Sequence, residues 1–161
     1  MPGCSFVDFY EEFFLIERSS MAELVYKGCI SEWFEGFDEN NLYIMDDGSC
    51  WIQDDFNYSP DYEYRPDVII LEIEDRYVMF VGDESAEVIP ANIVTISEID
   101  GEFNGWEEGV IYRLCNGEIW RQIGFEYEFD YAFEPLAVVC EVDGDYIMYV
   151  EGKRAVVERL N

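Results

Sequence analysis

The sequence predicts a mainly β protein, built from two tandem copies of one small unit behind an N-terminal amphipathic α-helix. Three observations support this class: an internal repeat, short apolar runs separated by turn dipeptides, and an aromatic stripe near the N-terminus. Residues 30–81 align without a gap on residues 99–150 at an offset of 69, and 17 of the 52 aligned positions are identical. Because chance does not hold register over that length, the chain is a duplication.

The repeat and the composition set the expected domain limits. We expect a helical segment over 1–27, a first repeat over 28–89 and a second over 90–161. Half of the residues are hydrophobic and 17% are aromatic, so each repeat has ample material for a core and disorder is not expected.

The N-terminal segment is helical by its spacing. Its aromatic residues fall at i, i+3, i+4, i+7 and i+8, which places them on one helix face; they are Phe6, Phe9, Tyr10, Phe13 and Phe14. A second short helical turn or a linker is expected over residues 19–24.

Short strands are predicted throughout the rest of the chain. In the second copy they cover 99–106, 110–114, 118–124, 137–142, 146–150 and 155–160. Asn116-Gly117 predicts a hairpin with a type I′ turn, and Asp47-Gly48 is its counterpart in the first copy. Five to six short antiparallel strands in about 60 residues favour a small closed β-barrel of the SH3-like size class, with a two-layer meander as the alternative.

One segment of the second copy, residues 125–134, alternates aromatic residues with acidic or small ones. On a strand this pattern gives one aromatic face and one carboxylate face. Both copies share the aromatic register, so we assign that face to the core. The outer face is either an ordinary solvated surface or an ordered anionic row, since same-face neighbours lie roughly 6.6–6.8 Å apart. That spacing is about two base steps of one DNA strand.

Charge is the second dominant feature. The formal net charge is −28, and residues 30–89 carry seventeen acids against two bases. Nucleic acid and anionic membranes are therefore poor partners, and a basic protein is the natural complement. With no leader-like or membrane-spanning apolar run and no CxxC pair among five cysteines, we expect a reduced, cytoplasmic protein. Cys50 and Cys140 align with Ile119 and Leu71, so they are expected in the core.

Enzymatic motifs are absent from the sequence. No histidine occurs, and no P-loop, dinucleotide or nucleophile-elbow motif is present. Residues 100–105 match the start of an EF-hand loop, but Ile111 stands where the bidentate glutamate is required. We therefore expect no enzyme, no cofactor and no specific metal site.

A family resemblance concerns residues 97–160, with a diverged copy over 28–88. The strings IDGEFNGW (99–106) and LCNGEIWRQ (114–122), the tyrosine-rich segment ending at Pro135, and YIMYVEG (146–152) resemble a small bacterial β-barrel module of unknown function. The resemblance implies a fold unit and no reaction. This chain departs from the module by its acids beside the tyrosines, which suggests a specialised partner.

Three functional hypotheses follow. The first is a nucleic-acid mimic that inhibits a restriction, CRISPR or other DNA- or RNA-handling protein by occupying its basic groove. The second is an immunity or adaptor protein that neutralises a basic toxin or peptide, and the third is adaptation to a salty cytoplasm. We favour the first hypothesis.

The candidate partner-binding residues are the acids of the tyrosine segments, the dense acids of the first copy and one tryptophan. Trp33 aligns with Glu102, so it is the better candidate for an exposed anchor, whereas Trp51 and Trp120 are equivalent and are assigned to the core. The full set is Asp46, Asp47, Asp54, Asp55, Asp61, Glu63, Glu126, Glu128, Asp130, Glu134 and Trp33.

Overall fold

The computed structural model describes residues 22–161. The chain divides after Pro90 into two compact units, unit 1 and unit 2. The predicted N-terminal helix lies outside the described residues up to position 21. Residues 22–27 were assigned to the same segment, but they belong to a strand, β1 (Ala22–Cys29).

All elements of residues 22–161 are strands, which confirms the mainly β class. Unit 1 contains β1, β2 (Trp33–Phe37), β3 (Leu42–Ile44), β4 (Cys50–Gln53), β5 (Ser59–Tyr64), β6 (Asp67–Ile73), β7 (Arg76–Val81) and the first half of β8 (Glu84–Glu98). Unit 2 contains the second half of β8, β9 (Glu102–Trp106), β10 (Ile111–Arg113), β11 (Ile119–Gln122), β12 (Glu128–Phe133), β13 (Leu136–Val142), β14 (Asp145–Val150) and β15 (Lys153–Arg159).

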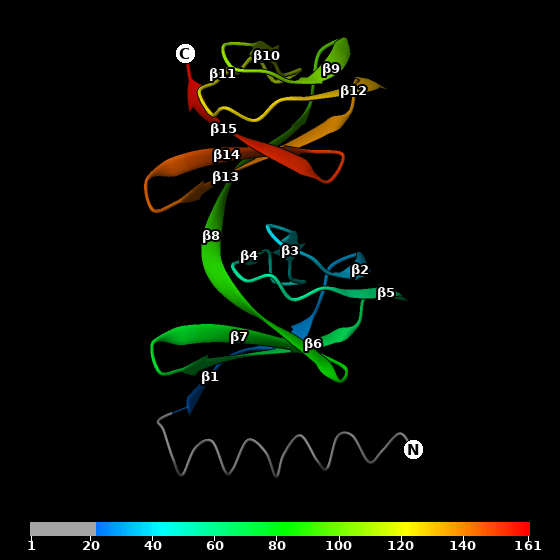
Figure 1. Ribbon diagram of the computed structural model, residues 1–161, viewed down its shortest axis with the longest axis vertical. Coiled ribbons are helices and arrows are strands. Elements are labelled where there is room, and N and C mark those ends of the chain that lie inside the picture. The colour runs from blue at the N-terminus through cyan, green and yellow to red at the C-terminus, as the bar shows by residue number, and fades with distance from the viewer. Residues whose placement is uncertain (1–21) are drawn as a thin grey trace. The chain divides into compact units, whose positions relative to one another are not determined.

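Both units have the same strand pairing. In unit 1, β1, β6, β7, the first half of β8, β4 and β3 pair in that order; in unit 2, the second half of β8, β13, β14, β15, β11 and β10 do the same. A separate two-stranded sheet completes each unit, β2–β5 or β9–β12 (Figure 1). The single strand β8 thus ends one repeat and begins the next, so the structural repeat starts at Ala22 and Ala91.

The expected closed barrel is not formed by the described residues. The ends of each strand path approach one another at a single bridge, Ile30 with Met45 in unit 1 and Ile99 with Leu114 in unit 2. No continuous ladder joins these ends. The sequence pattern predicts strands and turns, but closure depends on how far two edges pair, which the pattern does not specify.

The two cores correspond position by position. Each contains twelve buried residues, and every member of one cluster lies 69 positions from a member of the other. Trp51 and Trp120 are among them, as predicted, and so are Phe37 and its counterpart Trp106. Cys50 and Cys140 are buried as well, which confirms their assignment to the interior.

The hairpin predicted at Asn116-Gly117 is confirmed, but its turn type differs. Of these two residues Gly117 has a positive φ (94°) and Asn116 does not. The Gly117 N–H donates to the Leu114 carbonyl (3.0 Å), as in a three-residue loop with a left-handed glycine. Two consecutive positive φ values occur instead at Asp143-Gly144, between β13 and β14.

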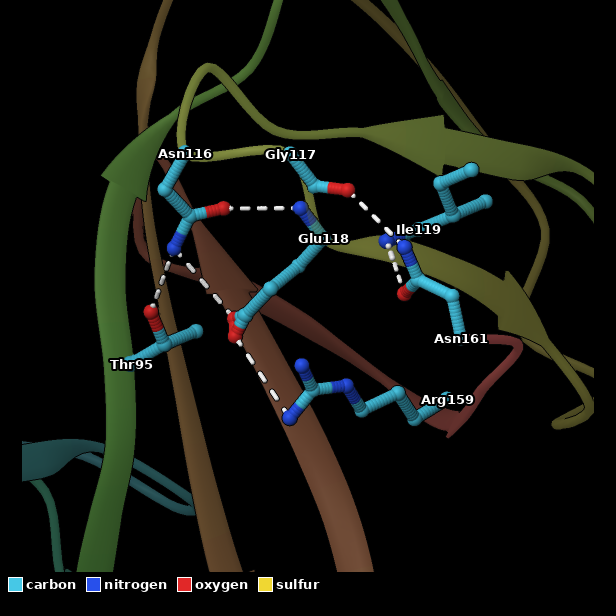
Figure 2. A network of polar contacts seen from close by, with 7 residues as sticks. All are labelled: Thr95, Asn116, Gly117, Glu118, Ile119, Arg159 and Asn161. Atoms are coloured by element: carbon cyan, nitrogen blue, oxygen red, sulfur yellow. Dashed lines mark hydrogen bonds and ion pairs between the residues drawn. The ribbon is translucent and has the colours of Figure 1, made fainter.

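Side chains fix this hairpin in unit 2 (Figure 2). Asn116 accepts from the Glu118 N–H (3.0 Å) and donates to the Thr95 hydroxyl (3.0 Å). The Asn161 side chain accepts from the Ile119 N–H (3.0 Å). These contacts hold the β10–β11 turn against both β8 and the end of the chain.

Candidate functional site

The aromatic face of the tyrosine segments is exposed, which contradicts its assignment to the core. Its residues are 54–85% exposed in both units, and Trp33, which stacks beside those of unit 1, is 51% exposed. We call them strip 1 and strip 2. Strip 1 comprises Phe56, Tyr58, Tyr62, Tyr64 and Trp33; strip 2 comprises Phe125, Tyr127, Phe129, Tyr131 and Phe133.

Strand register explains this outcome. Ala132 of β12 pairs with Phe103 of β9, and Glu63 of β5 pairs with Phe34 of β2. Directly paired residues of an antiparallel ladder share a face, and Phe34 and Phe103 are buried. The acidic and small residues therefore alternate to the face of Phe34 and Phe103, where Asp130 and Ala132 are half-buried. The other acids of the row, Glu63, Glu126 and Glu128 among them, lie at its margin and remain exposed, and the aromatic row faces outward. Sequence alternation defines two faces, but it does not tell which one is covered.

Glycines set the close contact between the paired strands. Gly36 and Gly105 have φ values of 94° and 100°. A Cβ at either position would lie 2.1 Å from a backbone carbonyl oxygen, that of Ser59 or of Glu128. Only glycine permits this approach, so these two residues hold β5 and β12 at their positions.

A buried glutamine anchors the loop before each strip. Gln122 is 1% exposed; its Oε1 accepts from the Glu107 N–H (2.9 Å) and the Tyr112 hydroxyl (3.0 Å). Its Nε2 donates to the carbonyls of Gly124 (3.1 Å) and Glu126 (2.8 Å). Burial raises the pKa of Tyr112 to about 12, so the hydroxyl stays protonated and donates.

Gln53 makes the equivalent contacts in unit 1. Its Oε1 accepts from the Asp38 N–H (2.9 Å) and the Tyr43 hydroxyl (2.7 Å), and its Nε2 donates to the Asn57 carbonyl (2.7 Å). Neither glutamine is among the site residues predicted from the sequence. A signal was present, because each lies two residues after a core tryptophan, hence on the same strand face.

Three of the four acids predicted at 46–55 are engaged in local structure. Asp46 accepts from the Tyr26 hydroxyl, which lowers its pKa, and Asp47 accepts from the N–H (2.9 Å) and hydroxyl (2.6 Å) of Ser49. Asp55 is half-buried and accepts from the Glu87 N–H (2.7 Å) and from Gln53 (2.9 Å). Asp54 is exposed beside it.

The other predicted acids border the strips without forming one continuous row. Glu128 and Asp130 lie on β12, whereas Glu126 precedes the strand and Glu134 follows it, at a φ of 49°. Glu128 is paired with Lys153 (2.7 Å), which raises the pKa of the lysine. In unit 1, Asp61 and Glu63 lie on the exposed strand β5. The regular phosphate-like spacing expected for residues 126–134 is therefore interrupted at both ends.

Trp33 is half exposed and belongs to strip 1. Its ring stacks on that of Tyr62, with ring centroids 4.6 Å apart and an interplanar angle of 16°. The ring centroid of Tyr64 lies 4.9 Å from that of Trp33. The equivalent residue of unit 2, Glu102, accepts from the Tyr131 hydroxyl (3.3 Å). The charge of Glu102 raises the pKa of Tyr131. One position thus extends the aromatic surface in unit 1 and adds a carboxylate in unit 2.

The borders of the two strips differ strongly in charge. Six aligned positions around strip 2 hold five carboxylates and no base: Glu102, Glu126, Glu128, Asp130, Ala132 and Glu134. The same positions around strip 1 hold two carboxylates and one guanidinium: Trp33, Asn57, Ser59, Asp61, Glu63 and Arg65. Strip 2 is therefore the more electronegative surface.

A hollow of about 430 Å³ adjoins strip 2. Tyr127 and Phe129 line it together with Glu102, Glu128 and Arg113. A larger hollow in unit 1, of about 680 Å³, lies beside Asp46 and Glu63 and includes Lys27 and Cys29. It brings two predicted acids together, away from the aromatic side chains of strip 1.

Within residues 22–161, no three histidine, cysteine, aspartate or glutamate side chains are placed to hold a metal ion. The same part of the chain contains no helix of the length and apolarity needed to cross a bilayer.

Comparison with known proteins gives no match, whether with family models, curated proteins or solved structures.

Proposed function

We propose that this protein is a non-enzymatic acidic inhibitor that binds the basic, nucleic-acid-binding surface of a partner protein. The observation that carries the proposal is the exposure of an aromatic strip bordered by carboxylates in each unit. Contiguous exposed apolar side chains of this kind are typical of protein–protein interfaces.

The partner's charge follows from that of the chain. A net charge of −28 attracts a basic surface over a distance of about one Debye length, and it gives fast, salt-dependent association. Aromatic faces add cation–π contacts to lysine and arginine side chains. Nucleic-acid-binding proteins present such cationic side chains along their binding grooves.

The proposed contact differs from a copy of the phosphate backbone. The acids around strip 2 are interrupted by Lys153 and by the ends of β12, so strict spacing does not support mimicry. The proposal therefore relies on the aromatic strip, with the carboxylates as its charged border.

Neutralising the border tests the proposal. The chain is added to complexes of basic nucleic-acid-binding proteins with fluorescent duplex DNA, and release of DNA is followed by anisotropy. We expect release with the wild type and a loss of at least tenfold in potency with Glu126→Gln, Glu128→Gln and Asp130→Asn combined. The matched control neutralises three exposed acids of the same unit that lie outside β12 and outside the six border positions: Asp143→Asn, Asp145→Asn and Glu151→Gln.

Two outcomes would contradict the proposal. One is the absence of DNA release at low salt for every partner tested. The other is an equal loss of potency in the control, which would mean that total charge and not the strip border is responsible.

A basic toxin or peptide is the second candidate partner. The Trp33–Tyr62 stack favours it, since one large aromatic anchor is typical of a tight, specific interface. Trp33→Ala would then abolish binding to that partner, whereas DNA release in the assay above would be absent.

A further inference from the structure

The duplication extends to the exposed surface. Strips 1 and 2 follow equivalent glutamines and lie largely on equivalent strands. The two ladders also share one register shift: it falls between Phe34 and Gly36 of β2 in unit 1, and between their partners' equivalents, Phe129 and Ala132 of β12, in unit 2. We propose that each strip is a separate docking site for an arginine-rich segment, so that one chain binds two such segments. This inference rests on the proposed function and adds its stoichiometry and side-chain preference.

Both strips are strongly exposed to solvent. Phe56 and Phe125 are each 85% exposed, and their tyrosine neighbours are exposed in both units. An isolated exposed aromatic residue is ordinary, but five exposed aromatic residues in each strip, four of them at aligned positions, form an apolar surface whose contact with water is unfavourable. Coverage by a partner removes that contact at both places.

An extended, arginine-rich peptide fits the chemistry of each strip. Alternate side chains of an extended peptide project to one face at roughly 6.6–6.8 Å, which is the spacing of regular same-face neighbours such as Tyr62 and Tyr64 on β5 or Tyr131 and Phe133 on β12. Arginine side chains on that face stack their planar guanidinium groups on the rings and pair with bordering carboxylates. Lysine has a compact, strongly hydrated charge and matches such a surface less well.

The two sites differ in the charge at their borders and in their ring contacts. Strip 2 has five bordering carboxylates, so its site gains more from charge and loses more with salt. Strip 1 has Arg65 at its end and Trp33 stacked on Tyr62, so its site depends more on ring contacts. We therefore infer one strongly and one weakly salt-dependent site in the same chain.

The test is calorimetric titration of the full chain with a ten-residue peptide of alternating glycine and arginine, at 50 and 300 mM NaCl. We expect two peptides per chain, and at least fivefold weaker binding of the lysine counterpart. Strip 1 is altered by Trp33→Ala, Tyr58→Ala and Tyr62→Ala; strip 2 by Tyr127→Ala, Phe129→Ala and Tyr131→Ala. Each set removes one site, and the site left in the strip 1 variant has the steeper salt dependence. Leu160→Ala, an exposed apolar residue outside the strips, is the control and retains both sites.

The outcomes separate this inference from the proposed function. Two results overturn the inference but leave the proposed binding of a basic partner intact. One is a single site that only the strip 2 variant removes, and the other is equal affinity for the arginine and lysine peptides. Binding of two peptides that neither variant changes also overturns it. If no basic peptide and no DNA-binding protein binds at low salt, the proposed function itself is contradicted. Circular dichroism of each variant confirms folding, and single substitutions Tyr62→Ala and Tyr131→Ala replace any set that unfolds.

Discussion

Strips 1 and 2 have the same backbone and different borders. The two units share the residues that set the backbone. The close glycine (Gly36 or Gly105) and the buried glutamine (Gln53 or Gln122) are identical, and the twelve aligned core residues are identical or similar. The bordering positions change from tryptophan, asparagine, serine and arginine to glutamate. The shared scaffold therefore fixes where the aromatic rings lie, whereas the charge around them differs between the two units.

A second pair of positions shows an exchange of residue types. In unit 1 Cys29 lies beside Asp46, with 3.5 Å between the Sγ and a carboxylate oxygen; the aligned residues of unit 2 are Glu98 and Cys115. Local desolvation and the nearby carboxylates of Asp100, Glu134 and Glu98 raise the pKa of the exposed Cys115 thiol. Each unit therefore has a thiol next to a carboxylate, but the two residue types have exchanged positions between the strand end (29 or 98) and the turn (46 or 115).

The largest effect should come from the close glycines. We expect Gly105→Ala to destabilise unit 2 by about 3–4 kcal/mol, because it adds a backbone clash to the strain of a positive φ. Gly109→Ala is the matched control: its φ is 88° but its Cβ meets open space, so about 1–2 kcal/mol is expected. Urea unfolding measures both, and equal losses would show that β12 does not pack against Gly105.

The buried glutamines should differ between units. Gln122→Leu leaves the Glu107 N–H and two loop carbonyls without this partner, which costs about 2–3 kcal/mol. Gln53→Leu also removes the hydrogen bond to Asp55, whose carboxylate accepts from the Glu87 N–H. We therefore expect a larger loss of unfolding free energy for Gln53→Leu than for Gln122→Leu. Urea unfolding of the two variants decides the order, and a larger loss in Gln122→Leu would contradict the network described for unit 1.

The position of Trp33 and Glu102 gives a smaller contrast. Trp33→Ala should destabilise unit 1 by about 1 kcal/mol, because it removes a stacked ring pair. Glu102→Ala, at the aligned exposed position, should change unfolding free energy by less than about 0.5 kcal/mol. Thermal unfolding compares them; an unchanged midpoint in Trp33→Ala would mean that the stack is not populated in solution.

The smallest effect is a titration. The charge of Glu102 raises the pKa of Tyr131, because a nearby anion disfavours the phenolate. Glu102→Gln should therefore lower this pKa toward the ordinary tyrosine value of about 10. Carbon-13 NMR of the tyrosine Cζ atoms measures it, with the aligned Tyr62 as internal control. No change at Tyr131 would place Glu102 away from the ring.

The sequence predicted the strands, the duplication and the core tryptophans, because turn dipeptides, periodicity and self-alignment are local signals. It missed which face of Phe125–Glu134 is covered, since that depends on the pairing of Ala132 with Phe103 across two distant strands. The assignment of the acids of 46–55 to a partner surface stays a prediction; the structure adds that Asp46, Asp47 and Asp55 accept hydrogen bonds from their own turns and neighbours. Local hydrogen bonds of this kind need coordinates to be seen.

Solvent exposure of the strips, alone and with a partner, is the most direct test of the account. Photochemically induced nuclear polarisation in NMR detects only exposed tyrosine and tryptophan rings. The account predicts polarised signals from Tyr58, Tyr62, Tyr127 and Tyr131, none from Tyr43 or Tyr112, and loss of the strip signals when the glycine–arginine peptide saturates the chain. Silent strip tyrosines in the free protein, or strip signals that persist at saturation, would contradict it.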